Sequence, residues 1–173
     1  MDDLRENIRG ERSFLEKIGR IIPGYSGYKE KLMRQEADKL LRDYLVQQIN
    51  VQMGYIKDLI DELTRAMKIK NLDLVDRPLK KLEKVRDRIR FASHGYTGWF
   101  SATKVDTSVL DKMYEFDNAL LDVVGIIAEK VQAARNSVDD DAALVAALQD
   151  LHRTVDETDI KYNERDNFVL QQK

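Results

Sequence analysis

The sequence predicts an all-α protein, an antiparallel bundle of about five helices built along one long helix. The chain of 173 residues contains only two prolines and eight glycines, and 35% of its residues are charged, a composition typical of long helices with solvated outer faces. From about Tyr28 to Lys70, apolar residues recur at three- and four-residue spacing without any proline. Read as one helix, this segment is about 64 Å long. The remaining helices must therefore be arranged along it.

Four further helices are predicted from apolar stripes and from the residues that flank them. They cover about 3–21, 73–92, 107–136 and 139–167, within a single domain of residues 1–173 whose tail from about 167 is expected to fray. Pro23 and Gly24 end the first of them. The run Asp139–Asp141 suits the start of the last, because carboxylates cap helix N-termini. Short connections between these helices favour antiparallel neighbours.

Two arrangements of these helices are open. The 3–21 and 73–92 helices are each about half as long as the 28–70 helix, so the preferred arrangement stacks them end to end along it. The alternative is a break near Gly54, the only glycine in the long segment, which would give a compact array of six helices. Gly54 marks either such a kink or a place where another backbone comes close.

Two connections share a pattern of glycine and aromatic residues. The segments 24–28, GYSGY, and 95–99, GYTGW, each follow a predicted helix. A glycine in this position adopts the left-handed conformation at low cost. The aromatic residues in and beside the two segments are Tyr25, Tyr28, Tyr96, Trp99 and Phe100.

These five aromatic residues form a candidate interaction surface, because aromatic side chains at loop tips make good binding anchors. The alternative is that they cap the bundle core and hold the two turns shut. A break at Gly54 would bring the two loops into one patch. A straight long helix would separate them by half its length.

The segment 22–31 also carries a resemblance. It reads IPGYSGYKEK and leads into the long helix, where Arg34, Ala37, Asp38 and Leu41 follow. With the loop FASHGYTGWF at 91–100, it resembles an uncharacterised family of prokaryotic helical proteins that carries I-P-G-Y-x-G-Y-K-E-K before a long helix. The resemblance implies a shared helical domain, and it brings no activity, cofactor or site residue with it.

Four polar residues interrupt the apolar stripes of the predicted helices. They are Gln48, Asp117, Thr158 and Arg165. Polar groups in such seams form hydrogen-bonded networks that fix the register of the helices. We therefore expect a buried polar network, with a direct pair between Asp117 and Arg165.

The residue types offer little catalytic or metal-binding chemistry. Cysteine is absent, which excludes disulfides, thiolate metal sites and cysteine nucleophiles. A carboxylate-bridged di-metal bundle needs Glu three residues before His, but Phe91 and Gln149 stand at that spacing from His94 and His152. No glycine-rich loop leads into a phosphate-binding Gly-Lys-Ser/Thr motif. We expect no cofactor, no metal site and no catalytic residue.

Charge is unevenly distributed along the chain. Residues 68–90 carry nine basic and four acidic side chains, a net charge of +5, whereas residues 106–166 carry six basic and fifteen acidic ones, a net charge of −9. The simplest interpretation is that the basic and acidic helices pack side by side. The alternative is that segment 68–90 meets an anionic membrane surface. Nucleic acid is disfavoured as a partner, because the surrounding chain is acidic and has no nucleic-acid motif.

Location and function follow from the same observations. The N-terminus lacks the apolar core of a secretory signal, and no apolar run reaches the length of a membrane span, so we expect a cytoplasmic protein without a transmembrane segment. The favoured hypothesis is a non-enzymatic adaptor or scaffold that uses coiled-coil-like helices to bind a protein partner or a second copy. One alternative is a small-molecule-binding or catalytic bundle with a pocket under the Trp99 loop. The other is peripheral membrane association through residues 68–90.

Overall fold

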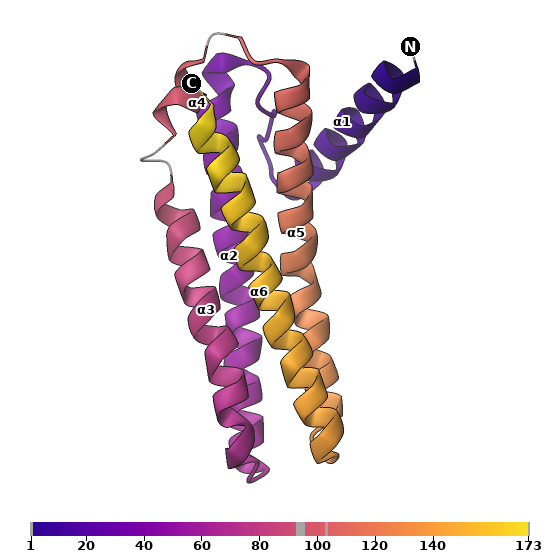
Figure 1. Ribbon diagram of the computed structural model, residues 1–173, viewed down its shortest axis with the longest axis vertical. Coiled ribbons are helices and arrows are strands. Elements are labelled where there is room, and N and C mark those ends of the chain that lie inside the picture. Colours follow the sequence, from indigo (N-terminus) through magenta and orange to yellow (C-terminus); the bar gives the residue numbers. More distant parts are fainter. Residues whose placement is uncertain (1, 93–95, 103, 173) are drawn as a thin grey trace.

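The computed structural model describes residues 2–92, 96–102 and 104–172, and every regular element in this part of the chain is helical (Figure 1). The elements are α1 (Asp2–Ile21), α2 (Lys31–Arg65), the 3-10 turn η1 (Ile69–Asn71), α3 (Leu72–Phe91), α4 (Thr97–Ser101), α5 (Thr107–Asn136) and α6 (Asp141–Gln171). The predicted all-α fold is confirmed. The described residues form six α-helices instead of five, because Thr97–Ser101, expected to be a loop, is the short helix α4.

Helices α2, α3, α5 and α6 form a bundle of two antiparallel hairpins, α2–α3 and α5–α6 (Figure 1). Helix α2 packs along α5 and runs in the same direction, and α3 is related to α6 in the same way. The connection from α3 to α5 therefore joins two helices that lie diagonally opposite each other. This connection contains α4, which packs on α2 and α6 at one end of the bundle.

Helix α2 runs through Gly54 without a break, so the alternative of a kink there is wrong. A Cβ atom built at Gly54 would meet nothing within 4 Å, so no other backbone comes close either. The helix is shorter than the predicted 28–70 span at both ends. It ends at Arg65 because Met67 adopts a left-handed φ of 59° and the Lys68 amide donates to the Leu63 carbonyl at 2.9 Å, which closes the last turn.

Helix α1 does not stack end to end with α3 along α2, so the preferred arrangement is also wrong. It packs against α5 and diverges from the bundle toward its N-terminus (Figure 1). The apolar residues Phe14, Ile18 and Ile22, in and just after its C-terminal half, are buried, which explains why this half is docked. The part of α2 beyond the end of α3 is covered by α4 instead.

The two ends of α6 are both well defined. At its start, the Asp140 side chain accepts a hydrogen bond from the Ala143 amide at 3.0 Å, and this cap was predicted from the aspartate run. At its end, α6 continues to Gln171, so the expected fraying from about residue 167 is wrong. The reason is that Val169 is buried and the Phe168 ring packs 5.4 Å from the ring of Phe116.

The basic helix α3 and the acidic helix α6 pack beside each other, as the simplest interpretation of the charge distribution predicted. Lys81 pairs with Asp156 at 2.5 Å, and Arg88 pairs with Asp159 at 2.8 Å. Lys84 on the same helix has no ion pair among the described residues. Much of the positive charge of α3 is therefore offset within the molecule. None of the described helices has the length and apolar character needed to cross a membrane.

Candidate functional site

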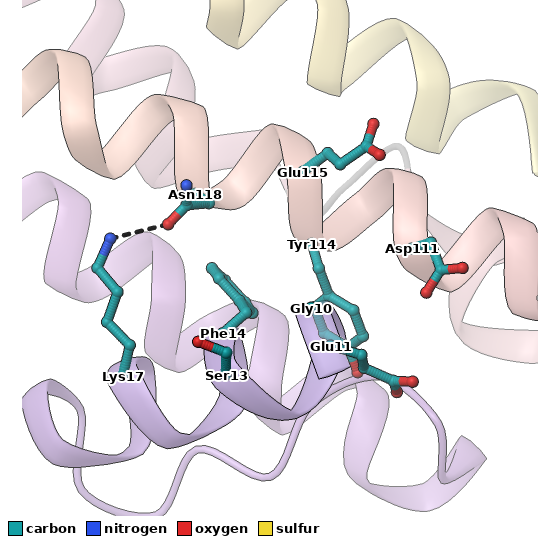
Figure 2. A pocket seen from close by; sticks show the side chains of 9 residues that line it. All are labelled: Gly10, Glu11, Ser13, Phe14, Lys17, Asp111, Tyr114, Glu115 and Asn118. Atoms are coloured by element: carbon teal, nitrogen blue, oxygen red, sulfur yellow. Dashed lines mark hydrogen bonds between the residues drawn. The ribbon is translucent and has the colours of Figure 1, made fainter. Parts of the chain in front are cut away.

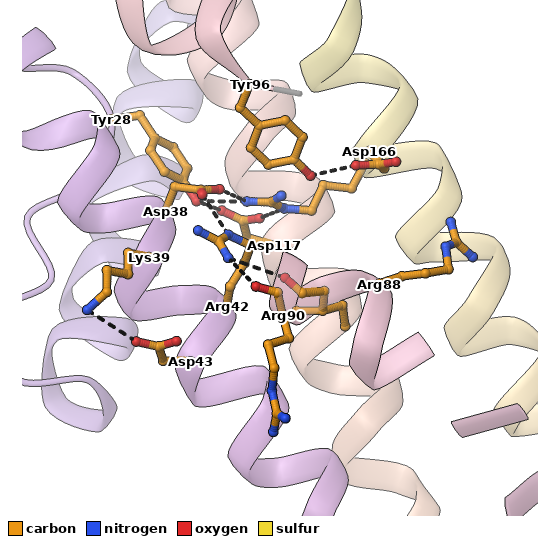
Figure 3. Close-up of polar contacts among 12 residues, drawn as sticks. Tyr28, Asp38, Lys39, Arg42, Asp43, Arg88, Arg90, Tyr96, Asp117 and Asp166 are labelled. Carbon is orange, nitrogen blue, oxygen red and sulfur yellow. Dashed lines mark hydrogen bonds and ion pairs between the residues drawn. The ribbon is translucent and has the colours of Figure 1, made fainter. Parts of the chain in front are cut away.

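A buried ionic network inside the bundle includes Tyr28, Asp38 and Asp117 (Figure 3), and Arg165 on α6 is at its centre. Its guanidinium donates from Nε to Asp117 Oδ1 at 2.6 Å and from Nη2 to Asp38 Oδ1 at 3.0 Å. The Tyr28 hydroxyl donates to Asp117 Oδ2 at 2.5 Å and accepts from Arg165 Nη2 at 3.2 Å. Burial opposes the positive charge of Arg165, but the carboxylates of Asp117 and Asp38 outweigh it and hold the Arg165 pKa well above its ordinary value.

Asp38 joins this network to a second arginine on α2. Arg42, one turn further along the helix, donates from Nε to Asp38 Oδ2 at 2.7 Å. Its Nη1 donates to the carbonyls of Ile89 and Arg90 at 3.3 Å each, near the end of α3, where carbonyls lack helical partners. The network contains two carboxylates and two guanidiniums, so its net charge is zero. It connects all four helices of the bundle.

Arg34 fastens the segment before α2 and the helix α4 to the bundle. It is buried, and it donates from Nε to the Tyr28 carbonyl at 3.0 Å. Its Nη1 donates to the carbonyls of Trp99 and Ala102 at 3.0 and 2.9 Å. The guanidinium also lies 5.0 Å from the centre of the Trp99 ring, a cation–π distance. These partners are backbone carbonyls and a ring, so Arg34 has a positioning role.

The structure places the aromatic residues of the candidate interaction surface in the core. Tyr25, Tyr28, Tyr96 and Trp99 are buried, and Phe100 is half-buried. The Tyr28 ring lies 5.5 Å from the Trp99 ring and 6.1 Å from the Tyr25 ring. The two loops converge although α2 is straight, because the chain after α1 runs back to the end of the bundle where α4 lies (Figure 1).

This burial corrects the hypothesis of an aromatic binding surface. The four buried rings have no exposed face with which to anchor a partner, and they instead cap the core, which was the alternative interpretation. Trp99 is enclosed between the Tyr28 ring and the Arg34 guanidinium, which occupy the space that the hypothesis of a pocket under the Trp99 loop assigned to a ligand.

The seam residues are only partly brought together. Asp117 and Arg165 form the expected direct pair. Thr158 is buried but donates to the Thr154 carbonyl of its own helix at 2.9 Å. Gln48 is half-buried at the surface between α2 and α5. Neither Thr158 nor Gln48 contacts the ionic network by a hydrogen bond.

Asp38 and Arg42 of the network, and Arg34 beside it, were not among the seam residues expected from the apolar stripes. These residues follow one another at intervals of four along α2, on the same face as Leu41 and Leu45. A row of charged residues within a buried apolar face is the signal that could have identified them. This signal is hard to recognise in the sequence, because the apolar stripe of the segment becomes continuous only after Leu41.

A groove opens between α1 and α5 where α1 diverges from the bundle (Figure 2). Its volume is about 440 Å³. The rings of Phe14 and Tyr114 line its base, with centroids 5.3 Å apart. Lys17 closes one end by donating to Asn118 Oδ1 at 2.8 Å. Both rings belong to the buried core, so the open space of the groove lies over them, between the two helices.

The other end of the groove is acidic. Figure 2 shows the side chains of Glu11 and Asp111 near Tyr114, one from each helix, and Glu115 follows one turn after Asp111 on α5. Glu115 lies 3.7 Å from the Lys112 amine. Burial raises the pKa of Asp111, and the charge of Glu115 adds to this effect.

The Tyr114 hydroxyl lies in the electrostatic field of these carboxylates. It accepts a hydrogen bond from the Tyr28 amide at 3.0 Å, which by itself would lower its pKa. Burial outweighs this contact, and with the nearby Glu11, Asp117 and Asp111 it raises the pKa of Tyr114 to about 12. The groove therefore gathers negative charge beside the Tyr114 hydroxyl.

His152 belongs neither to the ionic network nor to the lining of the groove. His152 is half-buried, and its Nε2 lies 3.5 Å from an Asp156 oxygen at the surface of α6. His94 lies outside the described residues. No group of three His, Cys, Asp or Glu side chains among the described residues is arranged to hold a metal ion.

Fold and site together define an all-α four-helix bundle with an accessory helix that leaves a groove beside it. No protein-family model, curated protein or solved structure matches the chain. The ionic network is closed, because its charges are paired with one another inside the bundle. The groove is open to solvent and is lined by carboxylates from both α1 and α5, so it is the candidate functional site.

Proposed function

We propose that the protein is a non-enzymatic adaptor or scaffold that binds a partner protein in the groove between α1 and α5. One observation carries this proposal: α1 diverges from the bundle toward its N-terminus, so a groove of about 440 Å³ lies open between α1 and α5. The walls of the groove are two helices. Such grooves suit an amphipathic helix, whose apolar side chains lie at intervals of three and four residues.

The groove has the rigidity that a binding site needs. Helix α5 is fixed by Asp117, which is held inside the bundle by Arg165 and Tyr28 three residues from Tyr114. Helix α1 is fixed by Ile18 and Ile22, both buried. A partner would therefore meet a preformed surface and would not have to order it, which favours affinity.

A site-specific crosslinking experiment tests this proposal. A photoreactive amino acid at Ser13, which lines the groove, is compared with one at Arg153, an exposed position on α6. We expect one partner to be crosslinked in cells from Ser13 and not from Arg153. The purified partner should then bind the wild-type protein and lose at least tenfold in affinity for a Ser13→Trp variant, whose side chain fills the groove.

The outcomes of this experiment are distinct. A second copy of the chain crosslinked from Ser13 would identify the partner as self-association through the same groove. Equal crosslinking from both positions, or a purified partner that binds Ser13→Trp as tightly as wild type, would refute the groove as the binding site. Circular dichroism of the Ser13→Trp variant checks that its helices are intact.

A further inference from the structure

We propose that the outer face of α3 docks on an anionic membrane surface, with lipid headgroups among its basic side chains and the α2–α3 turn inserted at the interface. This surface is separate from the groove between α1 and α5, so the inference goes beyond the proposed function and does not depend on it. Three features support it: a basic groove beside α3, the positive charge that remains after pairing, and two exposed apolar side chains at the turn.

Five basic side chains of α3 line a second groove, of about 440 Å³, between α3 and α6. These residues are Arg77, Lys80, Lys81, Lys84 and Arg88. Their spacing of three and four residues places them on one face of the helix over about 16 Å. Helix α3 packs on α2 and α6 at the edge of the bundle (Figure 1), and the side chains of Arg77 and Lys80 are 66% and 68% exposed. The basic face is therefore accessible to a large anionic surface.

Pairing leaves this part of the chain with an excess of positive charge. Residues 68–90 have a net charge of +5. The carboxylates of α6 that form ion pairs with them offset three of these charges, and they are Asp141, Asp156 and Asp159. Arg77 and Lys80 pair with carboxylates of α3 itself, but exposed pairs of this kind are weak. Either cation can therefore exchange its partner for a lipid phosphate.

The α2–α3 turn adds two apolar side chains at the start of the basic face. Met67 is 77% exposed and Ile69 is 59% exposed, and neither belongs to the hydrophobic core. Met67 also has a left-handed φ of 59°, which glycine adopts at lower cost, so the turn does not require its side chain. Both residues alternate with lysines, at Lys68 and Lys70. Apolar side chains among basic ones are typical of segments that bind the interface of anionic membranes.

The acidic turn of the other hairpin determines how the bundle meets the membrane. The α5–α6 turn lies at the same end of the bundle as the α2–α3 turn (Figure 1), and it contains Asp139–Asp141. An end-on approach would bring these carboxylates toward anionic lipid, so we infer an approach from the α3 side. Nucleic acid would also attract the basic face, but it would leave the apolar side chains of Met67 and Ile69 in water. An anionic membrane uses both features.

Sedimentation of the full chain with lipid vesicles tests the inference. The vesicles contain either phosphatidylcholine alone or phosphatidylcholine mixed with phosphatidylserine, which is anionic. We expect binding to the vesicles with phosphatidylserine, weakened by added salt because salt screens the charges, and no binding to phosphatidylcholine alone. Equal binding to both compositions, or binding to neither, would overturn the inference.

A pair of charge variants locates the binding surface. Lys80→Gln/Lys84→Gln removes two cations from the basic face and should bind the anionic vesicles at least about tenfold more weakly, with a smaller dependence on salt. The control Lys112→Gln/Arg153→Gln removes the same charge from exposed positions on α5 and α6 outside this groove, and it should bind as wild type does. Equal losses in the two variants would show that binding follows net charge alone and would refute α3 as the docking face.

A second pair of variants tests the insertion of the turn. Met67→Gly/Ile69→Ser removes both apolar side chains and keeps a residue suited to the left-handed φ. It should bind the anionic vesicles severalfold more weakly, with an unchanged dependence on salt. The control Leu32→Ser/Met33→Ser removes two exposed apolar side chains at the start of α2, at the other end of the bundle, and should have no effect. Circular dichroism checks that all the variants are folded.

A DNA duplex serves as the competing probe. Tighter binding to DNA than to anionic vesicles, lost in Lys80→Gln/Lys84→Gln and kept in Met67→Gly/Ile69→Ser, would assign the basic face to nucleic acid and overturn the membrane inference. Wild-type affinity of Met67→Gly/Ile69→Ser for anionic vesicles would refute the inserted turn.

Discussion

At the scale of single residues, Gly27 is the position that tolerates least change. Its φ of +79° lies in the left-handed region, and a Cβ atom there would come within 2.5 Å of Tyr114 Oη and 2.9 Å of Leu15 Cδ2. Gly27→Ala therefore adds a clash to a backbone strain of about 1–2 kcal/mol. We expect the free energy of unfolding, measured with urea, to fall by at least about 2 kcal/mol.

The variant Gly24→Ala separates the backbone strain from the steric clash. Its φ is +84°, but the nearest atom to a Cβ placed at this residue is Leu40 Cδ1 at 3.9 Å, an ordinary contact. Gly24→Ala should therefore cost only the backbone strain, about 1–2 kcal/mol. An equal loss of stability in the Gly24 and Gly27 variants would show that the close approach of Tyr114 to Gly27 does not matter.

Replacing Gly54 with alanine should increase stability, in contrast to the same change at Gly24 and Gly27. It lies inside α2 with a helical backbone and open space around its Cβ position. Gly54→Ala should raise the free energy of unfolding by about 0.5–1 kcal/mol, because alanine loses less conformational freedom on folding. A destabilised Gly54→Ala variant in urea denaturation would mean that α2 bends or meets another chain at this residue.

At the scale of elements, Arg34 decides whether the segment before α2 and the helix α4 stay on the bundle. Its three hydrogen bonds reach carbonyls from both. Lysine has the charge but a single nitrogen, so Arg34→Lys cannot satisfy the carbonyls of Tyr28, Trp99 and Ala102 together. We expect a loss of about 2–3 kcal/mol in stability, and a red shift of tryptophan emission under native conditions, because Trp99 is the only tryptophan.

The control for this variant is Arg12→Lys. The Arg12 side chain is 81% exposed and pairs only with Glu16 on the surface of α1. Its replacement should leave both stability and tryptophan emission within error of wild type. A blue or unchanged emission maximum for Arg34→Lys, together with wild-type stability, would contradict the fastening role of Arg34.

The elements also show what the sequence could and could not predict. The long helices followed from apolar spacing, and the start of α6 followed from its aspartate run, because both are local signals. The helix against which α1 packs could not be predicted, because an amphipathic stripe indicates that one face is buried but not which helix covers it. The convergence of Tyr28 and Trp99 likewise depends on the path of the chain after α1, which no spacing in the sequence encodes.

The ionic network and the groove differ in the same way. Asp117 and Arg165 could be predicted, because each interrupts an apolar stripe and the two have opposite charge. Glu11 and Asp111 could not, because each resembles the solvated carboxylates found throughout the helices of this chain. The two carboxylates lie in one groove only because α1 packs against α5 and leaves an opening between the two helices.

At the scale of the whole molecule, the ionic network should make stability depend on charge balance more than on any single contact. Arg165→Met would leave the buried carboxylates of Asp38 and Asp117 without their shared cation. Removal of one member of a buried ion pair typically costs about 3–5 kcal/mol. We expect a loss of this size in urea or thermal denaturation.

A double-mutant cycle measures the network directly. Asp117→Leu alone should also destabilise, but Asp117→Leu in the Arg165→Met background should cost less, since one stranded carboxylate is removed at the same time. A coupling free energy between the two positions of about 1–3 kcal/mol is expected for residues in one network. Additive losses would show that Asp117 and Arg165 act independently, despite the 2.6 Å contact between them.

The buried tyrosines predict how the whole bundle responds to alkaline pH. Burial is the main cause that raises the pKa of Tyr114 and of Tyr162 from 10.0 to about 12 in the folded protein. The unfolded chain therefore loses these phenolic protons first, and the free energy of unfolding is unaffected below pH 10 and falls as pH rises from about 10 to 12. Each tyrosine accounts for up to about 2–3 kcal/mol of this loss.

The measurement is far-UV circular dichroism followed together with the ultraviolet absorbance of tyrosinate. We expect the buried tyrosines to ionise in one cooperative step as helicity is lost, because they become accessible only when the bundle opens. In Tyr162→Phe one raised pKa is gone, although a hydrogen bond of 3.2 Å to the Arg88 carbonyl is lost as well. The variant should therefore start less stable but lose stability less steeply above pH 10. An identical slope for wild type and Tyr162→Phe would show that deprotonation of Tyr162 does not contribute to the alkaline transition.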